Sequence, residues 1–194
     1  MNLKKMPIKY FSHFMLRSIK KKDYKDLFDY GRKENVTKTL TWGPMIDVIE
    51  AKDSIKEIFL KRPSKGIPVG YAIVDLNLNK MIGTIDFHTK DDEKNIVEIG
   101  YALHDDYWNQ HIMTKALQLI IEVGFEYYHY DALMIKHLKR NIASQKVILN
   151  NGFEFIESYP YTFSKDKEKL ASVMLTYQMT KERYHEIKSR KGNI

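Results

Sequence analysis

The chain has 194 residues, a length typical of one domain or of one domain with a small extension. Hydrophobic residues make up 43% of it, which is enough for a packed core and excludes wholesale disorder. The chain contains no cysteine, which excludes disulfides, thiolate metal sites and a cysteine nucleophile. No stretch approaches the roughly 18 uncharged apolar residues that a membrane span needs.

The net charge of +7 is the second feature of the composition. A basic balance occurs in proteins that contact nucleic acid, an acidic partner or a polyphosphate cofactor. Here the basic residues are scattered, so ordinary surface charge explains most of them and a nucleic-acid-binding module is disfavoured. The first residues lack a long apolar run and a cleavage site, so we expect a cytoplasmic protein without membrane contact.

Hydrophobic spacing predicts the elements of the first half of the chain. Alternation of apolar and polar residues predicts a strand, and helical spacing predicts two helices after it. Runs rich in β-formers then predict a hairpin and a third strand. In chain order, these elements are a strand at His13–Ser18, a helix at Lys22–Lys33, a helix after the capping-box pair Asp47 and Glu50, a loop at Pro63–Pro68, and strands at Gly70–Leu76, Met81–His88 and Ile96–Leu103.

The second half begins with a strand–helix–strand pattern, which predicts a right-handed crossover and a parallel pair. Its expected elements are a helix at Thr114–Tyr128, a strand at Ala132–His137, a helix at Ile142–Leu149 capped by Asn141 and ended at Asn151-Gly152, strands at Glu154–Phe163 and Ala171–Met179, and a helix or tail at Lys181–Lys191. No repeat or linker divides the chain, so we expect a single domain over residues 1–194, with 181–194 as a C-terminal helix or tail. The order predicts a mixed α+β sheet rather than a doubly wound one.

The segment from Glu98 to Leu117 is the most informative for chemistry, because a strand runs through a polar turn into the start of a helix. Free backbone amides at such a turn, with the helix dipole behind them, form an anion site suited to phosphates. The turn lacks the glycines that usually let a backbone wrap a phosphate closely. From the residues alone, a plain structural connection is the alternative.

Two motifs in this region resemble the GNAT acetyltransferase superfamily, and more closely its Rim-type branch, the ribosomal-protein N-acetyltransferases and their relatives. In the acetyl-CoA signature, Asn109 and His111 stand where glycines are expected. The helix from Asn141 to Phe153 resembles a second signature of the family. The matching residues of the two motifs are Trp108, Ile112, Met113, Thr114, Ala116, Leu117, Asn141, Ser144, Val147, Gly152 and Phe153.

The resemblance implies a GNAT fold, whose mostly antiparallel sheet is splayed between its fourth and fifth strands and flanked by helices. It implies that acetyl-CoA is the co-substrate, with the pantetheine arm between Ile99–Leu103 and Ala132–His137 and the pyrophosphate at the amides of Gln110 to Lys115. The cofactor-binding residues so implied are Tyr101, Ala102, Leu103, Trp108, Asn109, Gln110, His111, Ile112, Met113, Thr114, Lys115, Asn141, Ser144 and Lys146.

Attack of an amine on a thioester needs a group that removes a proton from the ammonium and a group that protonates the leaving thiolate. The resemblance implies that Glu98 is the base. The alternatives are that a water is the base, or that Glu98 is only a solvated carboxylate at a strand edge. It implies that Ser144 is the acid, and the alternative is that Ser144 is a small residue packed near the cofactor. Many family members have a tyrosine acid four residues later, but Ile148 occupies that position here, so this helix offers no tyrosine acid. Trp42, Glu98 and Tyr159 are expected to contact the amine substrate.

The seven histidines show no metal-ligand spacing, and His104-Asp105-Asp106 is typical of a turn, so we expect no metal. These features indicate an N-acetyltransferase that moves the acetyl group of acetyl-CoA to a protein N-terminus or a small amine in a ternary complex. The alternative is a catalytically degenerate protein that binds CoA, motivated by the missing glycines at Asn109 and His111. A monomer and a homodimer are both consistent with the sequence.

Overall fold

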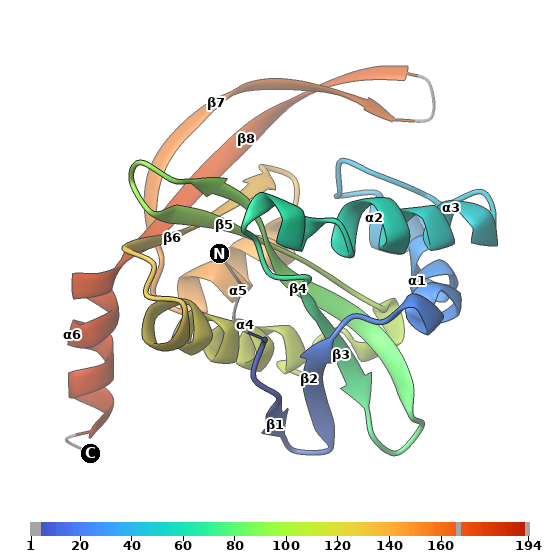
Figure 1. Ribbon diagram of the computed structural model, residues 1–194. Coiled ribbons are helices and arrows are strands. Elements are labelled where there is room, and N and C mark those ends of the chain that lie inside the picture. The colour runs from blue at the N-terminus through green and yellow to red at the C-terminus, as the bar shows by residue number, and fades with distance from the viewer. Residues whose placement is uncertain (1–4, 166–167, 193–194) are drawn as a thin grey trace.

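One mixed sheet organises the molecule in the computed structural model, which describes residues 5–165 and 168–192 (Figure 1). Within these ranges the sheet has eight strands in the order β1-β2-β3-β4-β5-β6-β8-β7. The strands are β1 (Lys9–Phe11), β2 (Phe14–Ser18), β3 (Tyr71–Asp75), β4 (Lys80–Asp91), β5 (Ile96–Leu103), β6 (Ala132–Leu138), β7 (Glu154–Lys165) and β8 (Glu168–Thr180). Neighbours are antiparallel except for β5 and β6, so the predicted parallel pair and the α+β class are confirmed.

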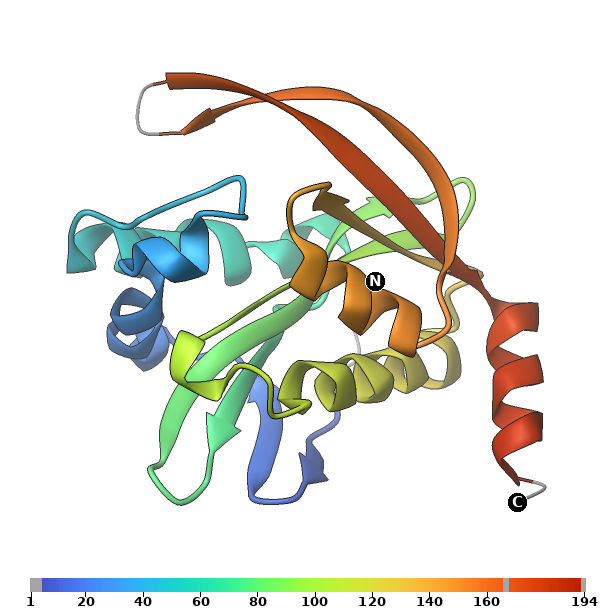
Figure 2. The same cartoon turned by 180° about the vertical axis from the view of Figure 1, so that it is seen from behind.

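Helices cover both faces of this sheet. They are α1 (Tyr24–Gly31), α2 (Glu34–Thr37), α3 (Val48–Asp53), α4 (Ile112–Glu122), α5 (Ile142–Asn150) and α6 (Lys181–Gly192). The first three lie on one side of the sheet, and α4 lies on the other with α5 beside it (Figures 1 and 2). Among the described residues, no helix combines the length and the apolar character that crossing a membrane requires.

Alternation along the central strands explains the two cores. On β3, Ile73 packs into the cluster that includes Leu117 of α4, whereas its neighbour Val74 packs into the cluster that includes Leu27 of α1. Successive side chains of a strand point to opposite faces, so a strand buried on both faces is apolar along nearly its whole length, as β3 is up to Asp75 at its end. The five residues of β3 are all buried, as this requires.

Local capping signals agree with the observed helix ends. The Asp47 carboxylate accepts hydrogen bonds from the backbone amides of Ile49 and Glu50 at the start of α3. Asn141 Oδ1 accepts from the Ser144 amide at the start of α5, at 3.0 Å. Gly152 follows α5 with a φ of +85°, a backbone conformation that favours glycine.

Several boundaries differ from the sequence-based expectation. The short strand β1 and the four-residue helix α2 were not predicted, because neither has enough residues for a periodic pattern. The expected loop at Pro63–Pro68 overlaps a 3-10 turn, Arg62–Lys65, and α4 begins at Ile112, two residues earlier than expected. The C-terminal segment is a helix, α6, rather than a tail.

The β7–β8 hairpin is the most extended part of the fold and arches away from the rest of the sheet (Figure 1). Near its tip, Lys165 Nζ donates a 2.8 Å hydrogen bond to the Thr37 carbonyl of α2. At its base, Tyr184 of α6 stacks on Phe125 with ring centroids 4.9 Å apart. The hairpin is therefore held to α2 near its tip, and the helix that follows it packs on Phe125.

Candidate functional site

The parallel strands β5 and β6 separate shortly after they begin. They pair from Ile96 opposite Ala132 to Glu98 opposite Met134, and the register ends there. Beyond this point β5 stays paired with β4 on its other edge, as far as Leu103 opposite Gly83. Among the described residues, the second edge of β5 over 99–103 thus lacks a strand partner, so its backbone faces the space between the strands.

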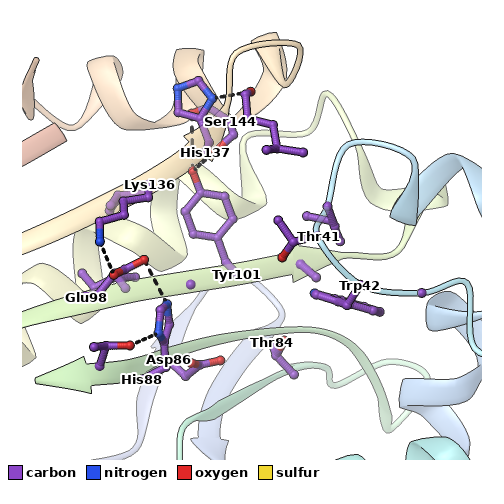
Figure 3. A pocket seen from close by; sticks show the side chains of 18 of the residues that line it. Thr41, Trp42, Thr84, Asp86, His88, Glu98, Tyr101, Lys136, His137 and Ser144 are labelled. Carbon is purple, nitrogen blue, oxygen red and sulfur yellow. Dashed lines mark hydrogen bonds and ion pairs between the residues drawn. The ribbon is translucent and has the colours of Figure 1, made fainter. Parts of the chain in front are cut away.

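A cleft of about 670 Å³ opens where β5 and β6 separate (Figure 3). The loop that follows α2 lines it with Trp42, and β7 lines it with Tyr159, so two of the predicted substrate residues face it from different elements. Other predicted residues in its lining are Glu98, Tyr101, Ala102, Asn141 and Ser144. Predicted residues outside the lining are Leu103, Trp108, Asn109, Gln110, His111, Ile112, Met113, Thr114, Lys115 and Lys146.

Glu98 is held between two basic side chains, as Figure 3 shows. Its carboxylate lies 3.2 Å from Lys136 Nζ on β6 and 3.6 Å from His88 Nε2 on β4, and its side chain is only 16% exposed. Burial alone would lower the pKa of Lys136, but the charge and the hydrogen bond of Glu98 outweigh burial and raise it. Glu98 is therefore an ion-paired, mostly buried carboxylate rather than a solvated one.

Asp86 forms a second ion pair in the cleft wall, with Arg62. Arg62 Nη1 lies 2.8 Å from Asp86 Oδ1, and both side chains are at most 10% exposed. The guanidinium also lies over the Phe59 ring, 4.4 Å from its centroid. Burial raises the pKa of Asp86, and the charge of Arg62 opposes that shift. Since sequence patterns gave no sign of either residue, this pair is known only from the structure.

Ser144 meets a tyrosine at the start of α5. The hydroxyls of Tyr101 and Ser144 are 2.8 Å apart, and Tyr101 Oη also donates to the Ser144 carbonyl at 3.3 Å. Burial raises the pKa of Tyr101, so its phenol remains protonated around neutral pH. The resemblance placed Tyr101 among the cofactor-binding residues; its hydroxyl adds a second candidate proton donor beside Ser144.

His137 on β6 is a buried histidine in the cleft lining. Its Nδ1 lies 2.9 Å from the Leu138 carbonyl, and its ring stacks on Tyr177 at 5.4 Å. A carbonyl only accepts, so Nδ1 is the nitrogen that carries the proton in the neutral ring. Burial lowers the pKa of His137, in agreement with this tautomer.

The turn between β5 and α4 has two left-handed residues that are not glycine. Asn109 has a φ of +59°, and His111, directly before α4, has a φ of +56°. Trp108 Nε1 donates a 2.9 Å hydrogen bond to the Leu103 carbonyl, which fixes the turn against the end of β5. At both positions the backbone thus has the left-handed conformation that favours glycine, directly before the N-terminal end of α4.

The neighbouring residues His104, Asp105 and Asp106 offer ligand atoms within 4.8 Å of one another. Lys33, between α1 and α2, already pairs with both aspartates, at 2.6 and 3.6 Å. His104 Nδ1 also accepts from the Asp106 amide, as in a turn. The group therefore has a structural explanation as an ion-pair network between the α1–α2 connection and the turn, and the absence of a metal stays a prediction.

Comparison with known proteins gives the family. Residues 13–154 match the Acetyltransferase (GNAT) domain. A relative from Bacillus licheniformis, the uncharacterized N-acetyltransferase p20, is 27% identical over 175 residues, which are 90% of this chain and 97% of the relative.

Solved structures show the same fold. The ribosomal-protein-S5-alanine acetyltransferase of Vibrio fischeri superposes with a TM-score of 0.74 at 19% identity, over 91% of this chain and 98% of the other. RimL, a ribosomal L7/L12 alpha-N-protein acetyltransferase solved with coenzyme A, gives a TM-score of 0.77 at 20% identity, over 91% and 99%. The GNAT fold implied by the two motifs is confirmed. The chain belongs to the GNAT acetyltransferase family.

Proposed function

We propose that this acetyltransferase moves the acetyl group of acetyl-CoA to the N-terminal amine of a polypeptide, in one ternary complex within the cleft between β5 and β6. The observation that supports this proposal most strongly is that an open strand edge and an ion-paired carboxylate lie side by side in the cleft. The separated strands leave one edge of β5 over 99–103 without a strand partner, and the ion-paired Glu98 lies where the separation begins.

The groups in and around the cleft suit the parts of acetyl-CoA. Backbone groups of Tyr101, Ala102 and Leu103 would pair with the amides of the pantetheine arm as a neighbouring strand would. Asn141 at the start of α5 borders the same space. The amides of Gln110 to Thr114 would hold the pyrophosphate at the start of α4, whereas the predicted Lys115 amide already donates to the His111 carbonyl at 3.0 Å. Exposed Lys146 on α5 would add a positive charge. A relative of the same fold, RimL, was solved with coenzyme A.

The polar side chains fit the two proton transfers. Glu98 would attract the ammonium of the substrate and hold it in the cleft, where the ammonium gives up a proton. The hydroxyl pair of Tyr101 and Ser144 would supply the proton that the departing thiolate takes up, since either oxygen is able to donate. No covalent intermediate on the protein is needed, which agrees with a chain that has no cysteine.

An open path for a polypeptide supports a protein acceptor over a small amine. A shallow groove on α3 and the following helical turn continues the cleft, because Glu50, Ser54 and Ile58 line both. Ile49 and Ile58 on this groove are 61% and 55% exposed. Residues that follow the acetylated one would lie here, beside Trp42. Two relatives of the same fold are named as ribosomal-protein acetyltransferases.

The alternative is a degenerate protein that binds CoA without acetyl transfer. Thermal shift with acetyl-CoA, CoA and a short DNA duplex tests binding first: we expect stabilisation by both CoA species and none by the duplex. Thiol release against a panel of peptides and small amines then tests transfer. Stabilisation without thiol release from any amine would favour the degenerate binder, and no stabilisation by acetyl-CoA would contradict the whole proposal.

A further inference from the structure

A β-bulge in β4 places a histidine beside Glu98. Phe87 pairs with Ile99 and Thr89 pairs with Glu98, so His88 is the extra residue between two regular pairs. A bulge re-aims the side chain of its extra residue, and bulges are frequent next to active sites. The side chain of His88 is 30% exposed, lines the cleft and faces Glu98 (Figure 3).

A glycine on the neighbouring strand makes room for this imidazole. A Cβ added at Gly100 would lie 2.9 Å from His88 Cδ2 and 3.1 Å from Nε2. The first distance is shorter than real Cβ contacts, so any larger residue at position 100 would displace the ring. The bulge in β4 and the glycine on β5 are independent features, and both favour the same position of the His88 side chain.

The groups around His88 come from three strands. Its Nδ1 lies 2.9 Å from Thr89 Oγ1, on the same strand. Its Nε2 faces Glu98 of β5, whose carboxylate is shared with Lys136 of β6. Asp86, also on β4, is the other nearby carboxylate, and its charge is matched by Arg62. The Glu98 carboxylate already pairs with the Lys136 ammonium, so the neighbouring imidazole is the second basic group that a substrate ammonium would meet here.

We propose that His88 takes the proton of the substrate ammonium, while Glu98 attracts the ammonium and stabilises the imidazolium that results. This inference rests on the proposed acetyl transfer and adds a catalytic residue to it. Lys136 is a positioning residue, because it acts through Glu98.

The step balances as follows. The ammonium gives one proton to His88 Nε2, and its lone pair attacks the acetyl carbon. The new C–N bond forms, the C–S bond breaks, and the electron pair of the latter leaves with sulfur. The thiolate gains a proton from the Tyr101–Ser144 hydroxyls, and the second proton that the amine nitrogen loses passes through solvent to restore those hydroxyls. His88 returns its proton to solvent, so one proton is released for each acetyl group transferred.

The test uses His88→Gln, with His185→Gln on the exposed face of α6 as the matched control. The assay is thiol release with the panel amine that the wild type acetylates fastest, followed across pH. We expect kcat for His88→Gln to fall about 100-fold, as for loss of a general base. We also expect the acidic limb of the pH profile of kcat/KM to move to lower pH, since a carboxylate alone would then act. Acetyl-CoA affinity should not change.

Gly100→Ala provides a second variant that keeps the histidine and displaces it. We expect Gly100→Ala to lower kcat, as His88→Gln does. An unchanged kcat and an unchanged acidic limb in His88→Gln would overturn the role of His88 while leaving acetyl transfer intact. A wild type that binds acetyl-CoA and acetylates no amine of the panel would overturn the proposed function itself, and the role of His88 with it.

Discussion

The phosphate turn, residues 104–112, and the acid–base cluster, Glu98 with its partners His88 and Lys136, are built in different ways. The turn is one continuous segment, and its proposed work is done by backbone amides whose direction follows from local conformation. The cluster gathers three side chains from three strands, and its geometry follows from strand register.

This difference decides how each region responds to substitution. A backbone site tolerates a change of side chain if the new residue accepts the same φ, as Asn109 and His111 do at +59° and +56°. A side-chain cluster loses its chemistry when one functional group is removed, even if the fold is unchanged. We therefore expect large effects on turnover in the cluster and small effects on stability or affinity in the turn.

The largest expected effect is that of Glu98→Gln. The amide keeps the size of the carboxylate but loses its charge, so it no longer attracts the ammonium or stabilises a protonated His88. We expect kcat to fall by about 10³-fold, with little change in acetyl-CoA affinity, measured by thiol release and by calorimetry. Glu93→Gln, in the exposed turn before β5, is the matched control. Unchanged turnover would remove Glu98 from the mechanism.

The hydroxyl pair should give the next effect. Ser144→Ala and Tyr101→Phe each remove one of two oxygens that lie 2.8 Å apart. Because the remaining hydroxyl partly replaces the lost one, we expect each variant to lower kcat by about 100-fold, the lower end for a general acid. The double variant should fall by more than the product of the two, because no hydroxyl is then left to replace the lost ones. Fully multiplicative losses would show that the two hydroxyls act separately.

The turn should show a smaller effect, on stability. His111→Gly fits a φ of +56° without a side-chain penalty, whereas His111→Val places a β-branched residue there. We expect the free energy of unfolding of His111→Val to lie about 1–2 kcal/mol below that of His111→Gly, measured by urea denaturation. Acetyl-CoA affinity should be retained in the glycine variant. Equal stability of the two variants would contradict the left-handed conformation.

The smallest effect concerns pH and His137. Its folded pKa lies below the unfolded value of 6.5 because of burial, so the unfolded chain binds more protons between the two values. Its contribution to stability is therefore complete above 6.5 and is lost as pH falls through the folded pKa. Between pH 7 and pH 5, the free energy of unfolding measured by urea denaturation should fall less for His137→Gln than for the wild type. Identical slopes would contradict a buried, neutral His137.

The sequence predicted the turn better than the cluster, for a physical reason. The strand, the turn and the helix start are local, and so is the cap that Asn141 forms, which the structure confirms. The proximity of Lys136 to Glu98 depends on the parallel register of β5 and β6, which no local pattern encodes. The bulge at His88 depends on a mismatch between β4 and β5, and the sequence shows only an apolar run ending there.

The elements followed the same rule. Long periodic segments such as α4 and β5 were predicted in type and nearly in extent. The three-residue β1 forms because β2 offers it a partner, and its own residues carry no pattern. The pair of Arg62 and Asp86 joins residues far apart in the chain, and only tertiary packing brings them together.

The central claim is that the cleft between β5 and β6 transfers an acetyl group to an N-terminal amine, and mass spectrometry of the products tests it most directly. The wild type would be incubated with acetyl-CoA and paired peptides that differ only in a free or a blocked N-terminus, beside Glu98→Gln. We expect one added acetyl group on the α-amine of the free peptide, none on the blocked one, and at least about 100-fold less product with the variant. Acetyl-CoA binding without any acetylated peptide, or equal product from the variant, would contradict it.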